Sequence, residues 1–175
     1  MSDDSRNVTD EFKGVPMDDI ISRLDERGSQ VEIAIENTLR DFNMGSIVRS
    51  ANAFGVRVVH IVGRRQWNKR GAMMTDKYLR VIYHSDFEAL REYADDSDRR
   101  IFAVDNVDGA SPLATTDRCV NAILLFGQEG SGLSKEALSA ADAIVAIEQI
   151  GSTRSLNVSV AAGIALYEWT VRMAH

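Results

Sequence analysis

Short apolar segments alternate along the chain with segments whose apolar residues recur at helical spacing, and this alternation limits the possible folds more than any other feature. The strands that it predicts are Val31–Glu36, Val56–Val62, Val81–His84, Arg100–Val104, Val120–Phe126 and Ala143–Ile147. The helices that it predicts between and after them are Gly45–Phe54, Asp86–Ala94, Ser134–Ala141 and Asn157–Met173. The run from Ile123 to Phe126 is entirely apolar, which is typical of a strand buried on both faces. The pattern therefore predicts an α/β fold with a mainly parallel sheet covered by helices on both faces.

The length and the two ends of the chain suggest one folded unit. At 175 residues the chain can bury a hydrophobic core without disulfides. Residues 1–14 are polar and are expected to form a disordered tail, whereas residues 15–175 are expected to form a single domain. Pro16 and Gly28 bracket a short helix at the start of that domain. The last predicted helix is apolar on several sides, which fits packing on the protein's own sheet and equally fits a homodimer interface.

Composition excludes several classes of protein. Cys119 is the only cysteine, so neither an internal disulfide nor a cysteine-based metal cluster can form. His60, His84 and His175 lack the spacing of metal ligands, and no metal site is expected. The chain begins MSDDSRN, with acidic residues where a signal peptide would be basic, and no apolar run reaches the roughly 18 residues of a membrane span. These features predict a soluble, cytoplasmic protein that does not enter a membrane.

Basic residues are concentrated in one part of an otherwise acidic chain. The formal net charge is −6, yet residues 57–80 hold seven bases against one acid, a local sum of +6. Five neighbouring side chains in this stretch are predicted to bind RNA: Arg64, Arg65, Trp67, Lys69 and Arg70. A cationic surface with one aromatic ring suits an RNA backbone and a stacked base. Composition alone favours a solvated charged loop, and only the motifs described below change that balance.

Polar residues interrupt the pattern at three strand-to-helix junctions, and such junctions in open parallel sheets border the crevice where ligands bind. The first runs from Glu36 to Arg49 and the third from Ile147 to Asn157. Asn43 and Asn157 each stand directly before a predicted helix, where an asparagine side chain can cap the helix N-terminus. Capping and ligand binding both remain open for these two residues.

The second junction reads GQEGSGLSK, from Gly127 to Lys135, and at first sight resembles a phosphate-binding loop. A Walker A loop would have lysine where Leu133 stands, and a dinucleotide fingerprint would have a third glycine that is missing here. Three glycines allow tight turns and let a ligand approach the backbone closely. With Glu129 among them, they favour a ligand-binding loop over a purely structural turn.

Taken together, the junctions resemble the SpoU/TrmH branch of the SPOUT methyltransferases. The three family motifs are matched, in order, by Asn43–Gly55, Gly127–Leu133 and Ser155–Ala161. Each match alone is weak, but three in order within Val31–Trp169 are strong. One departure lies at Ile147-Glu148-Gln149, where the family commonly has Ile-Pro-Met, and a carboxylate there is expected to alter the edge of the cofactor pocket.

The resemblance implies an enzyme that transfers a methyl group from S-adenosylmethionine to a ribose 2'-hydroxyl of tRNA or rRNA. It also implies a C-terminal trefoil knot and a homodimer in which both subunits contribute to each active site. The positions expected to contact the cofactor are Val104, Gly127, Ile147, Ser155 and Leu156. The positions expected to be catalytic are Arg49, Asn43, Glu129, Ser155 and Asn157.

Two other functions remain open on the sequence: methylation of a base nitrogen by a SPOUT enzyme, and RNA binding without catalysis by a protein that has kept the fold. Arg49 and the Ser-Leu-Asn sequence favour the ribose reaction, and the presence of every polar motif residue argues against lost catalysis. An arginine side chain keeps its proton throughout the pH range of proteins, so it is a poor general base. Arg49 is therefore expected to hold the target phosphate and hydroxyl while the proton leaves through a phosphate or water.

Overall fold

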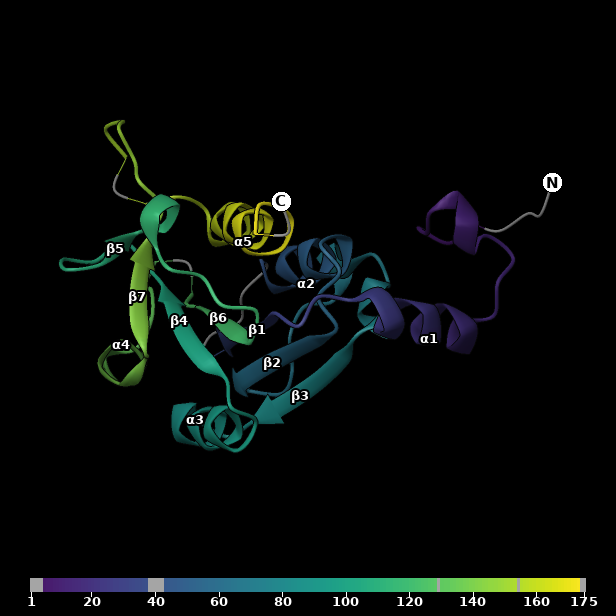
Figure 1. The fold of residues 1–175 in the computed structure, drawn as a ribbon, viewed down its shortest axis with the longest axis horizontal. Helices are drawn as coiled ribbons and strands as arrows, with labels where there is room; N and C mark the ends of the chain where they lie inside the picture. Colours follow the sequence, from purple (N-terminus) through teal and green to yellow (C-terminus); the bar gives the residue numbers. More distant parts are fainter. Residues whose placement is uncertain (1–4, 38–42, 129, 154, 174–175) are drawn as a thin grey trace.

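A computed structural model of the chain describes residues 5–37, 43–128, 130–153 and 155–173 (Figure 1). Its centre is a seven-stranded sheet in the order β3-β2-β1-β6-β4-β7-β5, and every neighbouring pair of strands runs parallel. The strands are β1 (Glu32–Asn37), β2 (Val58–Gly63), β3 (Arg80–His84), β4 (Arg100–Val104), β5 (Ser111–Pro112), β6 (Ala122–Phe126) and β7 (Ala143–Ala146). The predicted α/β class with a parallel sheet is confirmed. The two-residue edge strand β5 is too short to leave a sequence pattern.

The α-helices are α1 (Met17–Arg27), α2 (Met44–Ala53), α3 (Phe87–Asp96), α4 (Lys135–Ala140) and α5 (Val158–Leu166). Short 3-10 turns lie at η1 (Asp10–Phe12), η2 (Arg70–Ala72), η3 (Thr75–Tyr78) and η4 (Leu113–Thr115). The last predicted helix is α5 followed by a wider π turn, η5 (Tyr167–Val171), rather than one uniform α-helix. Within the described ranges, no helix is both long and apolar enough to cross a membrane.

Helices cover both faces of the sheet, with α2 and α5 on one face and α3 and α4 on the other (Figure 1). The central strand β6 contributes side chains to the hydrophobic core on both faces of the sheet. Leu124 and Phe126 pack with α2 and α5, whereas Ile123 and Leu125 pack with α3 and α4. Successive side chains of a strand point to opposite faces, so a strand covered on both faces must be apolar at every position.

The N-terminal segment departs from the disorder expected for residues 1–14. Residues 10–12 form η1, and the Phe12 side chain is only 5% exposed. Phe12 packs with Ile20 of α1 and Tyr78 of η3 in a small apolar cluster. The prediction of a tail from polar composition is wrong for this part of the segment, because a single aromatic residue is enough to anchor it to the domain.

A buried arginine fixes α1 against the sheet. Arg57 donates from Nε to Asp25 Oδ1 at 2.8 Å and from Nη2 to the carbonyl oxygen of Tyr78 at 2.7 Å. Its stem packs so closely that a β-carbon added at Gly28 would lie 2.4 Å from Arg57 Cγ. Arg57 was counted in the basic stretch, but it is only 6% exposed and joins α1 to η3 and β2.

Candidate active site

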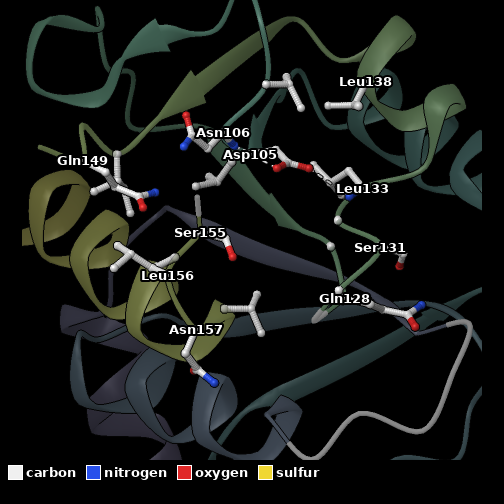
Figure 2. Close-up of a pocket in the computed structure, with 18 residues that line it drawn as sticks. Asp105, Asn106, Gln128, Ser131, Leu133, Leu138, Gln149, Ser155, Leu156 and Asn157 are labelled. Carbon is white, nitrogen blue, oxygen red and sulfur yellow. Dashed lines mark hydrogen bonds between the residues drawn. The ribbon is translucent and has the colours of Figure 1, made fainter. Parts of the chain in front are cut away.

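A pocket of about 410 Å³ opens beyond the carboxyl ends of β4, β6 and β7 (Figure 2). All five positions predicted to contact the cofactor line it: Val104, Gly127, Ile147, Ser155 and Leu156. They come from three separate strand ends and from the loop before α5, which the parallel sheet brings to one edge. The predicted set therefore forms one continuous lining, although the residues are up to 52 positions apart in the sequence.

The glycines of the second junction make a tight turn on one wall of this pocket. Gln128 and Gly132 exchange backbone hydrogen bonds of 3.1 and 3.0 Å, which close the loop into a tight turn. Gly130 and Gly132 have φ of +95° and +67°, a region that favours glycine. A β-carbon added at Gly127 would lie 2.2 Å from the carbonyl carbon of Gly132. These contacts explain why the turn contains three glycines.

Two carboxylates that the sequence reasoning missed hold this turn in place. Asp105, directly after β4, accepts a hydrogen bond from the backbone N–H of Leu133 at 2.9 Å (Figure 2). Glu36, at the end of β1 and only 6% exposed, accepts from the backbone N–H of Ser134 at 2.8 Å and from its hydroxyl at 2.6 Å. Ser134 in turn caps α4. An acidic residue at the carboxyl end of a strand was the only available signal for either role.

Two residues, Glu148 and Gln149, stand where the family commonly has Pro-Met, and only one of them reaches the pocket. Gln149 lines the pocket, whereas Glu148 is exposed and does not line it. The expectation that a carboxylate alters the pocket edge is therefore wrong for Glu148. The polar group present at the edge is the Gln149 amide.

The first and third junctions meet through their asparagines. Asn157 donates from Nδ2 to Asn43 Oδ1 at 3.0 Å, across 114 residues of sequence. Its own Oδ1 accepts from the backbone N–H of Ser159 at 3.0 Å and from the Ser159 hydroxyl at 2.6 Å. Asn157 thus caps α5 and holds Asn43 at the same time, whereas the Asn43 side chain makes no capping hydrogen bond to α2. Ligand binding by these two residues stays a prediction.

The three other predicted catalytic residues, Ser155, Arg49 and Glu129, are not brought together at the pocket. Ser155 lines it, but Arg49 lies on the exposed side of α2 and lines a different cavity, beside α1 and the N-terminal segment. Arg49 has no hydrogen-bond or ion-pair partner among the described residues. Glu129 lies outside the described ranges. Within one chain, therefore, the pocket and the predicted catalytic arginine belong to separate cavities.

The five predicted RNA-binding residues lie in the loop between β2 and β3, called the basic loop below. Four of its five predicted RNA-binding side chains are exposed: Arg64, Arg65, Lys69 and Arg70. Lys69 already pairs with Asp76 at 2.8 Å, and this hydrogen bond raises the pKa of the Lys69 ammonium. Trp67 is half-buried against the core, with Lys69 Nζ 5.3 Å from its ring centroid. RNA binding by this loop stays a prediction, and Arg64, Arg65 and Arg70 are its more available cations.

This loop approaches α2 most closely at two glycines. A β-carbon added at Gly45, in the first turn of α2, would lie 2.7 Å from the backbone nitrogen of Ala72. One added at Gly71 would lie 2.9 Å from the backbone nitrogen of Ser46. Any side chain at either glycine would force the loop and the helix apart.

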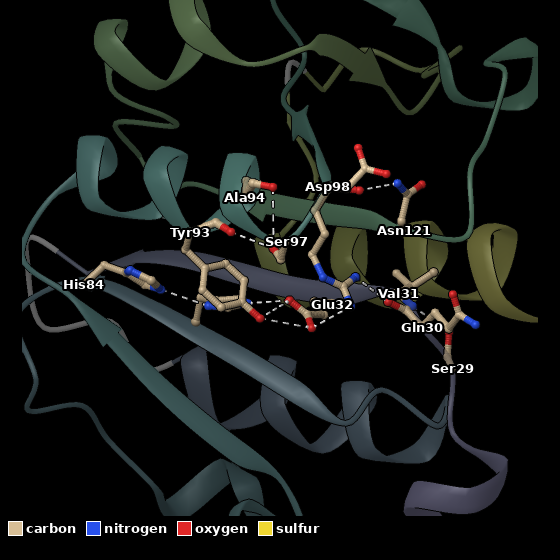
Figure 3. Close-up of polar contacts among 12 residues, drawn as sticks. Ser29, Gln30, Val31, Glu32, His84, Tyr93, Ala94, Ser97, Asp98 and Asn121 are labelled. Atoms are coloured by element: carbon tan, nitrogen blue, oxygen red, sulfur yellow. Dashed lines mark hydrogen bonds and ion pairs between the residues drawn. The ribbon is translucent and has the colours of Figure 1, made fainter.

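A buried polar cluster lies on the other face of the sheet, next to α3 (Figure 3). Glu32 accepts from His60 Nε2 at 2.8 Å, from Arg99 at 3.0 Å and from the Tyr93 hydroxyl at 3.2 Å. Because a carboxylate only accepts, His60 carries its hydrogen on Nε2 and its Nδ1 accepts from His84 Nε2 at 2.9 Å. Burial, and then the neighbouring His60, lower the pKa of His84. In the part of the chain that the structure describes, no three acidic, histidine or cysteine side chains could hold a metal ion.

Known proteins resemble this chain over most of its length. A profile of the SpoU rRNA Methylase family matches residues 30–167. The tRNA (guanosine(18)-2'-O)-methyltransferase of Escherichia coli K12 is 30% identical over 152 residues, which cover 85% of this chain and 66% of that enzyme. The structure of the A. aeolicus TrmH/SpoU tRNA modifying enzyme has a TM-score of 0.77 at 24% identity, covering 90% of this chain and 84% of that one. The AdoMet-bound rRNA methyltransferase of Sinorhizobium meliloti has a TM-score of 0.73 at 26% identity, covering 83% and 57%.

Proposed function

The chain belongs to the SpoU rRNA methylase family, and we propose that it transfers a methyl group from S-adenosylmethionine to a ribose 2'-hydroxyl of RNA. The observation that carries this proposal is the convergence of all five predicted cofactor positions on one pocket. The Asn43–Asn157 hydrogen bond supports it further, because it links two of the three family motifs at the rim of that pocket. The family description and the E. coli relative's name give rRNA and tRNA as the two substrates to test first.

The pocket suits S-adenosylmethionine in size and in chemistry. Its volume of about 410 Å³ lies in the range of roughly 300–1,000 Å³ found for small-molecule sites. Val104, Ile147 and Leu156 provide apolar walls for a purine ring, while Gln149 and Ser155 provide polar groups. When bound, the cofactor supplies a methyl group on a sulfonium, which is electrophilic enough for a hydroxyl oxygen to attack.

The protein's own contribution is to bring the hydroxyl to that methyl group in line. Correct orientation of two reactants can lower a barrier by roughly 7–11 kcal/mol. Asn157 accepts from Ser159 and donates to Asn43, so these hydrogen bonds orient both asparagine side chains at this edge of the site. Arg49 is a permanent cation that can hold an RNA phosphate through two parallel hydrogen bonds, placing the adjacent ribose.

We infer that the active site is shared between two subunits. Arg49 and the pocket occupy separate cavities of one chain, so Arg49 would act on the pocket of a partner subunit. The α5 region offers a surface for the pairing, with Val160, Ile164 and Tyr167 exposed by 50%, 38% and 47%. The C-terminal trefoil knot and the cytoplasmic location stay predictions.

The activity is tested by calorimetric titration of the protein with S-adenosylmethionine and by methylation of tRNA and rRNA transcripts. Arg49→Ala is expected to bind the cofactor normally and to lose most methyl transfer, and the product ribose is mapped by its resistance to alkaline hydrolysis. A protein that does not bind S-adenosylmethionine would overturn the proposal in favour of RNA binding without catalysis. A methyl group found on a base would favour the base-methylating alternative.

The shared site has its own test, in which two inactive variants are mixed. Gly127→Val blocks the pocket of one chain and Arg49→Ala removes the arginine of the other. If each site combines a pocket from one subunit with Arg49 from its partner, half of the re-equilibrated dimers are mixed and each has one intact site. Activity should then return to roughly a quarter of the wild-type value. A mixture that stays inactive, although dimers form and exchange, would contradict the shared site.

A further inference from the structure

The pocket beyond β4, β6 and β7 contains one charged side chain. Among the described residues that line it, Asp105 alone carries a formal charge. The other lining residues are apolar residues, glycines, serines, asparagines and glutamines. Figure 2 shows Asp105 near the middle of the lining, between Gln149 and Leu133. A neutral lining with a single carboxylate is complementary to a ligand that carries positive charge.

Backbone hydrogen bonds orient the Asp105 carboxylate without using all of it. Its Oδ2 accepts from the Leu133 N–H at 2.9 Å, and its Oδ1 accepts from the Asn106 N–H at 2.8 Å. A carboxylate has about four acceptor positions, so these two hydrogen bonds leave further positions for a ligand. The side chain is half-buried, and salt screens such a charge less than a fully exposed one. Asp105 therefore presents a fixed negative charge to the pocket.

The methyl transfer proposed above changes the charge of the molecule in this pocket. When the ribose oxygen takes the methyl group, the electron pair of the broken sulfur–carbon bond stays on sulfur. The positive sulfonium of S-adenosylmethionine thus becomes the neutral thioether of S-adenosylhomocysteine, and the hydroxyl proton leaves to a phosphate or water. The amino acid part of the molecule is the same before and after. The two molecules therefore differ by one positive charge.

We propose that Asp105 makes the pocket selective for the charged cofactor over the neutral product. The proposal rests on the methyltransferase function and adds a determinant of cofactor exchange to it. Opposite unit charges about 4 Å apart attract strongly enough in water to change an equilibrium roughly 6-fold, and more strongly in a medium of lower dielectric constant. The attraction fades as the sulfonium loses its charge, so it assists binding of the cofactor and release of the product and does not accelerate the transfer itself.

The test compares three ligands by isothermal titration calorimetry: S-adenosylmethionine, S-adenosylhomocysteine and sinefungin, in which a protonated amine replaces the sulfonium. The quantity of interest is the Kd of the neutral product divided by the Kd of each charged ligand. Asp105→Asn removes the charge at nearly constant size and should lower both ratios, by roughly 6-fold at a separation of about 4 Å in water.

A structural role of Asp105 in the turn predicts a different result. A displaced turn would weaken the binding of all three ligands by a similar factor and leave both ratios unchanged. Melting temperatures show whether the variant folds. If Asp105→Asn does not fold, Asp105→Ser replaces it, because a serine hydroxyl can also accept from the Leu133 N–H.

Asp108→Asn is the matched control. Asp108 lies three residues further along the same loop, is exposed and does not line the pocket. Its substitution changes the net charge by the same amount, so it should keep the wild-type ratios. Unchanged ratios in the folded Asp105 variant would overturn the proposal, and so would an equal change in Asp108→Asn. Either result, with S-adenosylmethionine still bound, leaves the methyltransferase function standing, whereas a wild-type protein that binds none of the three ligands would refute that function.

Discussion

Replacing Gly127 with alanine should weaken binding of S-adenosylmethionine by an amount that the structure allows us to bound. The added β-carbon would lie 2.2 Å from the Gly132 carbonyl carbon and 2.4 Å from the Gly132 oxygen and the Leu133 nitrogen. All three are backbone atoms, so no side-chain rotation can relieve the overlap and the turn itself must move. Overpacking of this kind costs roughly 1–3 kcal/mol. This cost falls on the folded protein with or without cofactor, and it reaches the Kd only to the extent that binding must return the turn to its original position. We therefore expect the Kd to rise, with roughly 5- to 150-fold as the upper range.

The measurement is isothermal titration calorimetry of Gly127→Ala with S-adenosylmethionine. Gly151→Ala is the matched control, because a β-carbon there meets nothing within 4 Å and its φ is not in the left-handed region. Melting temperatures show whether the displacement stays within the turn. The reasoning is refuted if Gly127→Ala keeps both the wild-type Kd and the wild-type melting temperature, since the close contacts would then have no energetic consequence.

Two further predictions concern stability. Trp169 is fully buried, its ring centroid lies 4.9 Å from that of Phe102, and its indole N–H donates to the Cys119 carbonyl at 3.2 Å. The free energy of unfolding, measured in urea, should therefore fall by roughly 3–5 kcal/mol in Trp169→Ala. A loss below about 1 kcal/mol would show instead that the core repacks. Because the pKa of His84 is lowered in the folded state, the unfolded chain binds its proton first as the pH falls below the ordinary value of 6.5. The His84 contribution to stability should therefore be complete above that pH, decline below it and level off beneath the folded pKa. Between pH 8 and pH 5 the urea midpoint of unfolding should vary less in His84→Gln than in the wild type. Parallel curves of midpoint against pH for the two proteins would contradict this.

Much of the fold could be predicted from periodicity because each strand end and helix start leaves a local pattern. β4 was predicted at its observed bounds, and most of the other elements are displaced by only one or two residues. The order of the strands could not be predicted, because β6 lies between β1 and β4 only through contacts among distant parts of the chain. The structured part of the N-terminal segment was missed for a related reason, since one buried Phe12 outweighs its polar neighbours.

The candidate site was predictable where a motif marked it and not elsewhere. The cofactor positions were assigned by resemblance, and they do line one pocket. Asp105 and Glu36 were missed because a single acidic residue gives no spacing to interpret. The sequence did not predict that His60 and His84 are in contact, because they are 24 positions apart and lack the spacing of metal ligands. The parallel register of β2 and β3 brings them to 2.9 Å, a relation that only pairing of the strands reveals.

The close approach of the backbones at Gly45 and Gly71 limits how the basic loop could change. With no side chain on either glycine, the backbones are so close that the basic loop cannot move nearer to α2 without a collision. The changes that this contact tolerates best are exchanges of side chains that leave the path of the loop backbone beside α2 unchanged. A loop transferred from a relative would fit only if it had glycine at position 71 and if α2 kept glycine at position 45.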